Sequence, residues 1–130
     1  MIMEIALRAK LLANAPLVAI VGPRITWTER PQGNALPAIV LQVVADNRPQ
    51  DFKARVDFRD TRVQIDCFAA TRSVVVSLRE AVINALSVQG EIAGVSFGRV
   101  FINNVIDRGE DTDTGFVHRD LIDATIWHNA

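Results

Sequence analysis

The clearest pattern in the chain is an alternation of apolar and polar positions from Asp60 that gives way, after Thr71, to helical spacing. Two sets of positions alternate along the first part: Val63, Ile65, Cys67 and Ala69 against Arg62, Gln64, Asp66 and Phe68. A period of two predicts a strand with one side on the core. From Arg72 to about Gln89 the apolar stripe predicts an amphipathic helix that begins at a Thr71 cap and ends at Gly90. This strand and helix organise the prediction for the rest of the chain.

The residues before this unit predict two helices and two strands. Glu4 to Ala13 has the composition of an amphipathic helix, and Pro16 can begin a second short helical turn. Arg24 to Thr28 is predicted as a short strand. Leu36 to Ala45 is predicted as a longer one, and because it is apolar on both sides we expect it to be covered on both faces.

The residues after the unit predict a hairpin. Val95 to Ile106 and Phe116 to Trp127 both alternate, and a polar turn, Asp107 to Thr114, joins them. Two such strands are expected to pair antiparallel. In the first strand we expect one side to carry Phe97, Phe101 and Val105, and the other side Val100, Ile102 and Ile106.

The order of these elements predicts an α+β fold. We expect one domain over residues 1–130, built as a two-layer sandwich in which a mostly antiparallel sheet carries one long helix across one face, with a further helix at the N-terminus. The other face then needs an explanation. Its expected residues mix aromatic and charged types: Arg62, Gln64, Asp66, Phe68, Leu121, Asp123, Thr125 and Trp127. Such a surface suits either solvent or a subunit interface.

The stretch from Asp46 to Arg59 has a different character. It packs Lys53, Arg55 and Arg59 among acidic residues, with few apolar positions. A solvated loop is the simplest interpretation, and an arm that contacts a partner is the sharper one, since long loops without internal structure are often functional. We refer to residues 46–59 as the arm.

Composition excludes several classes of protein. The chain has 130 residues, 49% of them hydrophobic, which is enough to build a core without disulfides or metals. A formal net charge of -1 argues against a dedicated nucleic-acid binder. Cys67 is the one cysteine and falls on the apolar side of its strand, so we expect a core thiol in a reducing compartment. No signal peptide or membrane span is predicted, and we expect synthesis in the cytoplasm.

No catalytic, cofactor or metal constellation is predicted. His118 and His128 stand ten residues apart on one strand, roughly 33 Å at the rise of a strand, and cannot share a metal or a proton. Acidic residues in the segment DRGEDTDTG (107–115) lack the glycine and the closing glutamate of a calcium-binding loop. We expect this segment to be an exposed acidic turn.

Four stretches in a fixed order carry a family resemblance. An opening helix leads to VGPRI (21–25), and then come PQGNALPAIVLQ (31–42), RVQIDCFAAT (62–71) before the amphipathic helix, and LIDATIWH (121–128). This succession resembles the tail-completion or tail-terminator proteins of long-tailed bacteriophages and prophages. The resemblance covers nearly the whole chain and departs from the family in the arm.

The resemblance implies a structural virion protein with no enzymatic activity and no cofactor. Proteins of this family have a similar α+β fold and assemble as a ring, commonly a homohexamer, at the head-proximal end of the tail. There the ring stops polymerisation of the tail tube and offers the surface for head-tail joining, while DNA passes through without being read. The implied partners are the tail tube protein and the head-tail connector. Our candidate ring or partner contacts are Lys53, Arg55, Arg59, Arg62, Asp66 and Trp127.

Two other functions stay open at this point. The first alternative is a head-closure or connector adaptor of the head-to-tail interface. Such a protein would bind purified connector complexes in preference to tail tubes. A small ligand-binding domain or enzyme is the more distant one, and it requires a closed pocket with converging polar groups.

Overall fold

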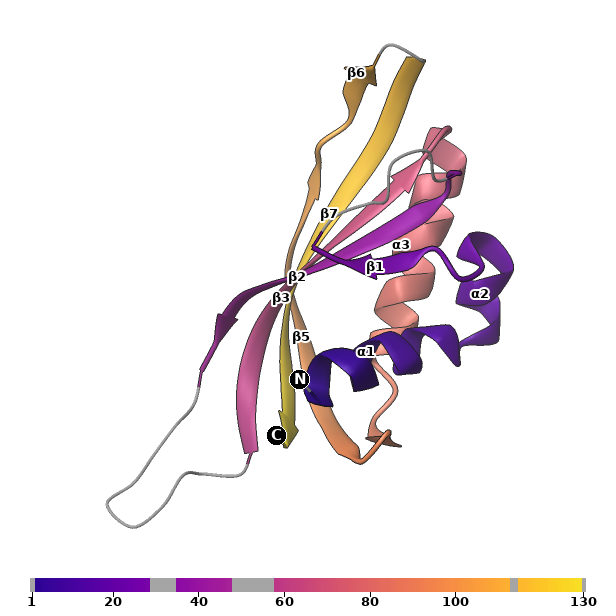
Figure 1. The fold of residues 1–130 in the computed structure, drawn as a ribbon. Helices are drawn as coiled ribbons and strands as arrows, with labels where there is room; N and C mark the ends of the chain where they lie inside the picture. Colours follow the sequence, from indigo (N-terminus) through magenta and orange to yellow (C-terminus); the bar gives the residue numbers. More distant parts are fainter. Residues whose placement is uncertain (1, 29–34, 48–57, 113–114, 130) are drawn as a thin grey trace.

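The computed structural model describes residues 2–28, 35–47, 58–112 and 115–129. Within these ranges the chain forms three helices and a curled sheet with the strand order β1-β2-β3-β7-β5-β4, and β6 also pairs with β7 (Figure 1). The helices are α1 (Ile2–Leu12), α2 (Ala15–Val21) and α3 (Arg72–Leu86). The strands are β1 (Ile25–Trp27), β2 (Ala38–Asp46), β3 (Phe58–Ala69), β4 (Gly90–Ile92), β5 (Val95–Asp107), β6 (Glu110–Thr112) and β7 (Gly115–Asn129).

The predicted α+β class is confirmed. β1 runs parallel to β2, and the other strand pairs are antiparallel. Figure 1 shows the three helices gathered on one side of the sheet. The finer expectation, a two-layer sandwich built on one long helix, stays a prediction.

The core lies between the helices and the central strands β3 and β7. Ile65 lies opposite Ile122 and Val63 opposite Ala124, and all four side chains are fully buried. The fully buried residues of α3 that face them are those of the predicted stripe: Val75, Leu78, Val82 and Leu86. Burial of such side chains contributes about 1.5–3 kcal/mol each, so this layer supplies much of the driving force for folding.

The beginning of α3 is as predicted, whereas its end is not. The Thr71 hydroxyl accepts a hydrogen bond from the Val74 amide, as an N-cap residue does. The helix ends at Leu86 rather than near Gln89, because Ser87 caps it and donates its hydroxyl to the Ile83 carbonyl. Gly90 therefore does not terminate the helix. It opens β4 with a φ of 144°, a conformation that disfavours other residues.

β5 departs from its predicted alternation at two bulges. Its register with β7 shifts between Phe97 and Val100 and again between Ile102 and Asn104. Each bulge inserts one residue and so moves the following side chains to the opposite face of the sheet. Phe97 is buried whereas Phe101 is 46% exposed, so the expectation that they share a side is wrong.

Two further expectations need correction. β2 is buried only from Ala38 to Leu41, and its remaining residues are exposed or half-buried. This strand is therefore covered on both faces only in its first part. The predicted polar turn contains a strand, because Glu110–Thr112 pairs with Gly115–Val117 and extends the hairpin. The hairpin itself is antiparallel, as predicted. Most of the arm lies outside the described residues.

We expect Leu78→Ala in α3 to lower the free energy of unfolding by about 2–5 kcal/mol, because it leaves a cavity at a fully buried site. Urea denaturation followed by circular dichroism measures this change. The neighbouring exposed residue offers a matched control, and Ser77→Ala should change stability by less than about 0.5 kcal/mol. Equal effects at the two positions would contradict the packing described here.

Candidate assembly surface

The sheet face away from the helices is the largest part of the fold that no helix covers (Figure 1). We call it the open face. Strand register places the following side chains on it: Arg62, Gln64, Asp66 and Phe68 of β3, Arg119, Leu121, Asp123, Thr125 and Trp127 of β7, and Phe101 and Ile106 of β5. Most of these side chains are half-buried because they lie against one another along the sheet.

Two ion pairs between β3 and β7 order the charges of the open face. Arg62 Nε donates to Asp123 Oδ1 over 2.9 Å, and a second donor of the same guanidinium reaches the other carboxylate oxygen. Arg119 Nη2 donates to Asp66 Oδ2 over 2.8 Å, and its guanidinium also lies 5.3 Å from the ring centre of Phe68. These bidentate and stacked contacts use the planar geometry of arginine.

The ion pair between Arg62 and Asp123 shifts the pKa values of both residues. The hydrogen bond to Asp123 raises the pKa of Arg62, and the hydrogen bond from Arg62 is the largest cause that lowers the pKa of Asp123. Both groups therefore stay charged at neutral pH. The open face presents ordered charges of both signs together with aromatic surface.

The structure places the predicted contact residues in different settings. Arg62 is exposed on the open face, Asp66 is buried beneath Arg119, and Trp127 is half-buried opposite Asp60. Arg59 is only 7% exposed. Lys53 and Arg55 lie outside the described residues.

Arg59 belongs to a buried polar cluster on the helix side of the sheet. Its Nε lies 3.1 Å from Asp46 Oδ1, which joins the two strands from which the arm departs. The Thr61 hydroxyl in the same cluster lies 2.6 Å from His128 Nε2, and both residues are fully buried. The contact between Arg59 and Asp46 therefore joins the end of β2 to the beginning of β3, the two strands that the arm connects.

His128 is a neutral ring in this cluster. Burial is the main cause that lowers its pKa below the ordinary value of 6.5. The hydrogen bond with the Asn129 carbonyl opposes this shift, Arg59 adds to it, and Asp46 and Asp60 oppose it more weakly. That carbonyl lies 2.6 Å from Nδ1 and can only accept, so Nδ1 carries the proton. Nε2 lies 2.6 Å from the Thr61 hydroxyl oxygen, which also lies 3.1 Å from Asp46 Oδ1.

A second buried polar cluster joins the sheet to α3, and sequence reasoning missed it. The Asp120 side chain is 1% exposed and receives hydrogen bonds from Arg72 over 2.8 Å and from Arg79 over 2.9 Å. Asp120 lies opposite Cys67, whose thiol is fully buried and has a pKa raised mainly by that burial. This cluster fixes the helix on the sheet. It holds no accessible nucleophile.

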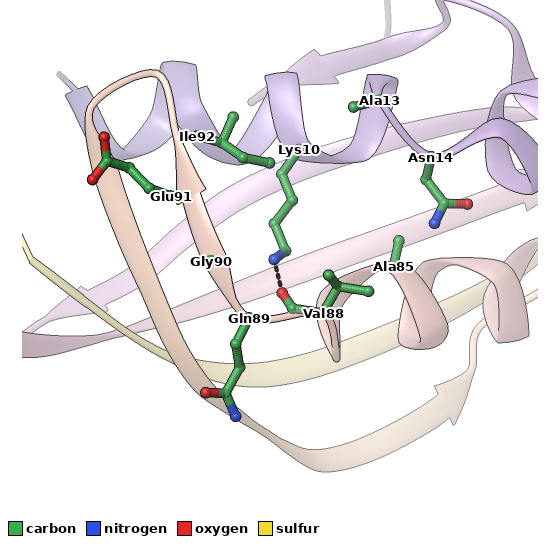
Figure 2. Close-up of a pocket in the computed structure, with 9 residues that line it drawn as sticks. All are labelled: Lys10, Ala13, Asn14, Ala85, Val88, Gln89, Gly90, Glu91 and Ile92. Atoms are coloured by element: carbon green, nitrogen blue, oxygen red, sulfur yellow. Dashed lines mark hydrogen bonds between the residues drawn. The ribbon is translucent and has the colours of Figure 1, made fainter.

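A pocket of about 300 Å³ lies between α1, the end of α3 and β4, and Figure 2 shows the residues that line it. Lys10 enters it, donates to the Val88 carbonyl and lies 5.0 Å from the ring centre of Phe97. Burial lowers the pKa of Lys10. Lys10 thereby connects α1 to the segment between α3 and β4, which is a structural role. Within the described ranges, no three histidine, cysteine or acidic residues are grouped as a metal would require.

Comparisons with known proteins assign the family. A profile described as "Tail completion protein gp17" matches residues 5–125. A solved chain in "Virion of native gene transfer agent (GTA) particle" superposes with a TM-score of 0.65 and 15% sequence identity. The superposition covers 98% of this chain and 95% of that one, and it shows a shared fold. No curated protein matches the chain.

The protein is therefore a structural component of a phage virion and not an enzyme. It belongs to the family of the tail completion protein gp17, as the match over most of its length shows. The resemblance found in the sequence is thereby confirmed. None of the helices in the described part of the chain is long and apolar enough to cross a membrane.

We expect the unfolding free energy to fall as the pH drops below about 6.5, because the unfolded chain then binds a proton at His128 that the folded chain excludes. The limiting slope for one proton is about 1.4 kcal/mol per pH unit. Chemical denaturation between pH 7.5 and pH 5 measures it. His128→Gln should flatten this decline, and His118→Gln should leave it in place. An unchanged slope in His128→Gln would show that other groups cause the loss.

Proposed function

We propose that this chain closes the head-proximal end of the phage tail tube as a hexameric ring, stops tube polymerisation and offers the surface that joins the head. Membership of the tail completion family is the observation that carries the proposal. In this proposal residues 1–130 act as one two-layer domain, with α3 as the long helix of the covered layer and the open face turned toward neighbours.

The chemistry of the open face supports a role in assembly. It combines exposed Phe101 with arginines that are already ordered by Asp123 and Asp66. Aromatic residues and arginine are enriched in protein interfaces, and pre-ordered side chains lose less entropy when a partner binds. A ring can therefore form on this face without reorganising it.

The arm is the proposed contact with the tail tube. Lys53 and Arg55 are its candidate interfacial charges. Arg59 contributes differently, since it is buried and holds the root of the arm through Asp46. DNA is proposed to pass through the ring without sequence-specific contacts, in keeping with a net charge of -1.

Tube-length control gives the most direct test of the function. Purified protein added to polymerising tail tube protein should arrest the tubes, and electron microscopy should show a shorter length distribution. Phe101→Glu should abolish the arrest, because it places a new charge on the open face. Val88→Glu is the matched control, since Val88 is 60% exposed beyond the end of α3, and it should arrest tubes like the unmodified chain.

Two results would redirect the proposal. Unchanged tube growth, together with binding to purified connector complexes, would assign the chain to head closure instead. If the Phe101→Glu variant still arrested tube growth fully, the open face would not be needed for arrest, and the proposed tube-capping function would remain.

We expect the double substitution Lys53→Glu and Arg55→Glu to weaken tube binding and to leave the stability of the chain unchanged. A pull-down with purified tubes measures the first effect, and thermal denaturation the second. Arg59 is left intact because reversing a buried charge would disturb folding itself. Normal tube binding by the double variant would exclude these two arm charges from the tube contact.

A further inference from the structure

A groove of about 360 Å³ lies between α1 and β1. It is lined by Glu4, Ile5, Arg8, Ala9, Leu12 and Trp27. Ile5 is 65% exposed, although the other side of the same helix is buried in the core. Exposed apolar side chains gathered in a groove are typical of an interaction site. We call this site the α1 groove.

Two hydrogen bonds order the α1 groove. Arg8 Nε donates to the Ile25 carbonyl over 2.7 Å, and Trp27 Nε1 donates to the Glu4 carbonyl over 3.2 Å. The guanidinium of Arg8 forms no ion pair with a carboxylate of the described residues, Glu4 one turn earlier included. The groove therefore offers an apolar wall beside an arginine whose Nη donors can still bind a carboxylate.

The hairpin of β6 and β7 carries matching groups on one face. Asp111 lies opposite Phe116, and directly opposite residues of antiparallel strands point to the same side. Both side chains are exposed, Phe116 at 48%. Asp111 has no ion pair within the described part of the chain.

The ring of Phe116 is held in place within its own chain. It packs so closely on Gly109 that a Cβ at this position would lie 2.6 Å from the ring. On its other neighbour, His118, it makes an edge contact with ring centres 4.8 Å apart. A side chain that is already ordered loses less entropy when it binds a partner.

The hairpin and the α1 groove lie far apart in one copy. Figure 1 shows β6 and the beginning of β7 projecting past the helices at one end of the sheet, whereas α1 lies toward the other end. A contact between them therefore joins two copies. Apolar surface meets apolar surface in such a contact, and the Asp111 carboxylate meets the Arg8 guanidinium, so both shape and charge are complementary.

We infer that the hairpin of one copy docks in the α1 groove of the next. The phenyl ring of Phe116 packs against Ile5 and Trp27, and the carboxylate of Asp111 binds Arg8. The inference rests on the proposed ring, because head-to-tail contacts between two different patches generate closed rings. The occupant of the groove is thus a second copy of this chain.

Exchange of the two charges tests the docking. Arg8→Asp and Asp111→Arg should each reduce the native mass from that of the ring to that of a single chain. Both substitutions in one chain should restore the ring, because the ion pair forms again with its signs reversed. Glu110→Arg is the matched control. It makes the same change of charge beside Asp111 but on the opposite face of the hairpin, so it should keep the ring.

Thiol crosslinking tests the apolar half of the contact. Chains with Ile5→Cys and Phe116→Cys should give a ladder of oligomers up to the ring with a short bis-maleimide. The native Cys67 is fully buried and does not compete. Val44→Cys with Phe116→Cys should give no ladder, since Val44 is 50% exposed and lies on β2, outside the groove.

Each other result overturns the inference in a recognisable way. Ring-sized particles from both single charge variants, without a ladder from the thiol variant, would reject the docking while the proposed ring survives. Loss of the ring in the single variants without recovery in the double variant would reject the pairing of Asp111 with Arg8. Unmodified chains that form no ring in solution or on tail tubes would reject the ring and the docking together. Circular dichroism of each variant confirms that the substitutions leave the fold intact.

Discussion

The antiparallel pairing of β3 with β7 is the constraint on which the rest of the structure depends. The two strands stay in register from Phe58 opposite Asn129 to Ala69 opposite His118. Because side chains alternate along a strand, this register decides which residues of β3 and β7 face the helices and which lie on the open face. A shift of β3 by one position would put Arg62 into the core. The apolar stripe of α3 and the ion pairs of the open face both stabilise the same register.

The helix side of these strands is not purely apolar, and its polar groups fix how the layers meet. Asp120 binds Arg72 and Arg79 of α3, while Thr61 and His128 contact each other near the root of the arm. Buried polar groups are costly unless they are satisfied, so each cluster admits few alternative arrangements. This rigidity suits the proposed assembly, in which every copy presents the same open face.

The sequence predicts the parts of the fold that follow from periodicity. The strand before Thr71, the cap of α3 and the final hairpin are all present, because each has a repeating pattern or a capping residue. The bulges of β5 were missed, since an inserted residue leaves no periodic signal. Gly98 and the Asn103-Asn104 pair are the local hints, because glycine inside a strand can indicate a bulge.

The candidate site was predictable only in part. Alternation placed Arg62 and Asp123 on one face, whereas their mutual ion pair depends on a register that the sequence does not specify. Extending the same alternation from Ile122 and Ile126 would have placed Asp120 and His128 on the core side. Arg59 falls in a charged stretch that predicts exposure, but its pairing with Asp46 across two strands buries it.

The native mass of the purified protein, measured by light scattering on a sizing column, is the first test of the proposed hexameric ring. We expect a particle of about six times the 14.3 kDa mass of the chain, seen as a ring in negative-stain images. A monomer at all concentrations, together with tail tubes that carry no ring at either end after incubation with the protein, would contradict it.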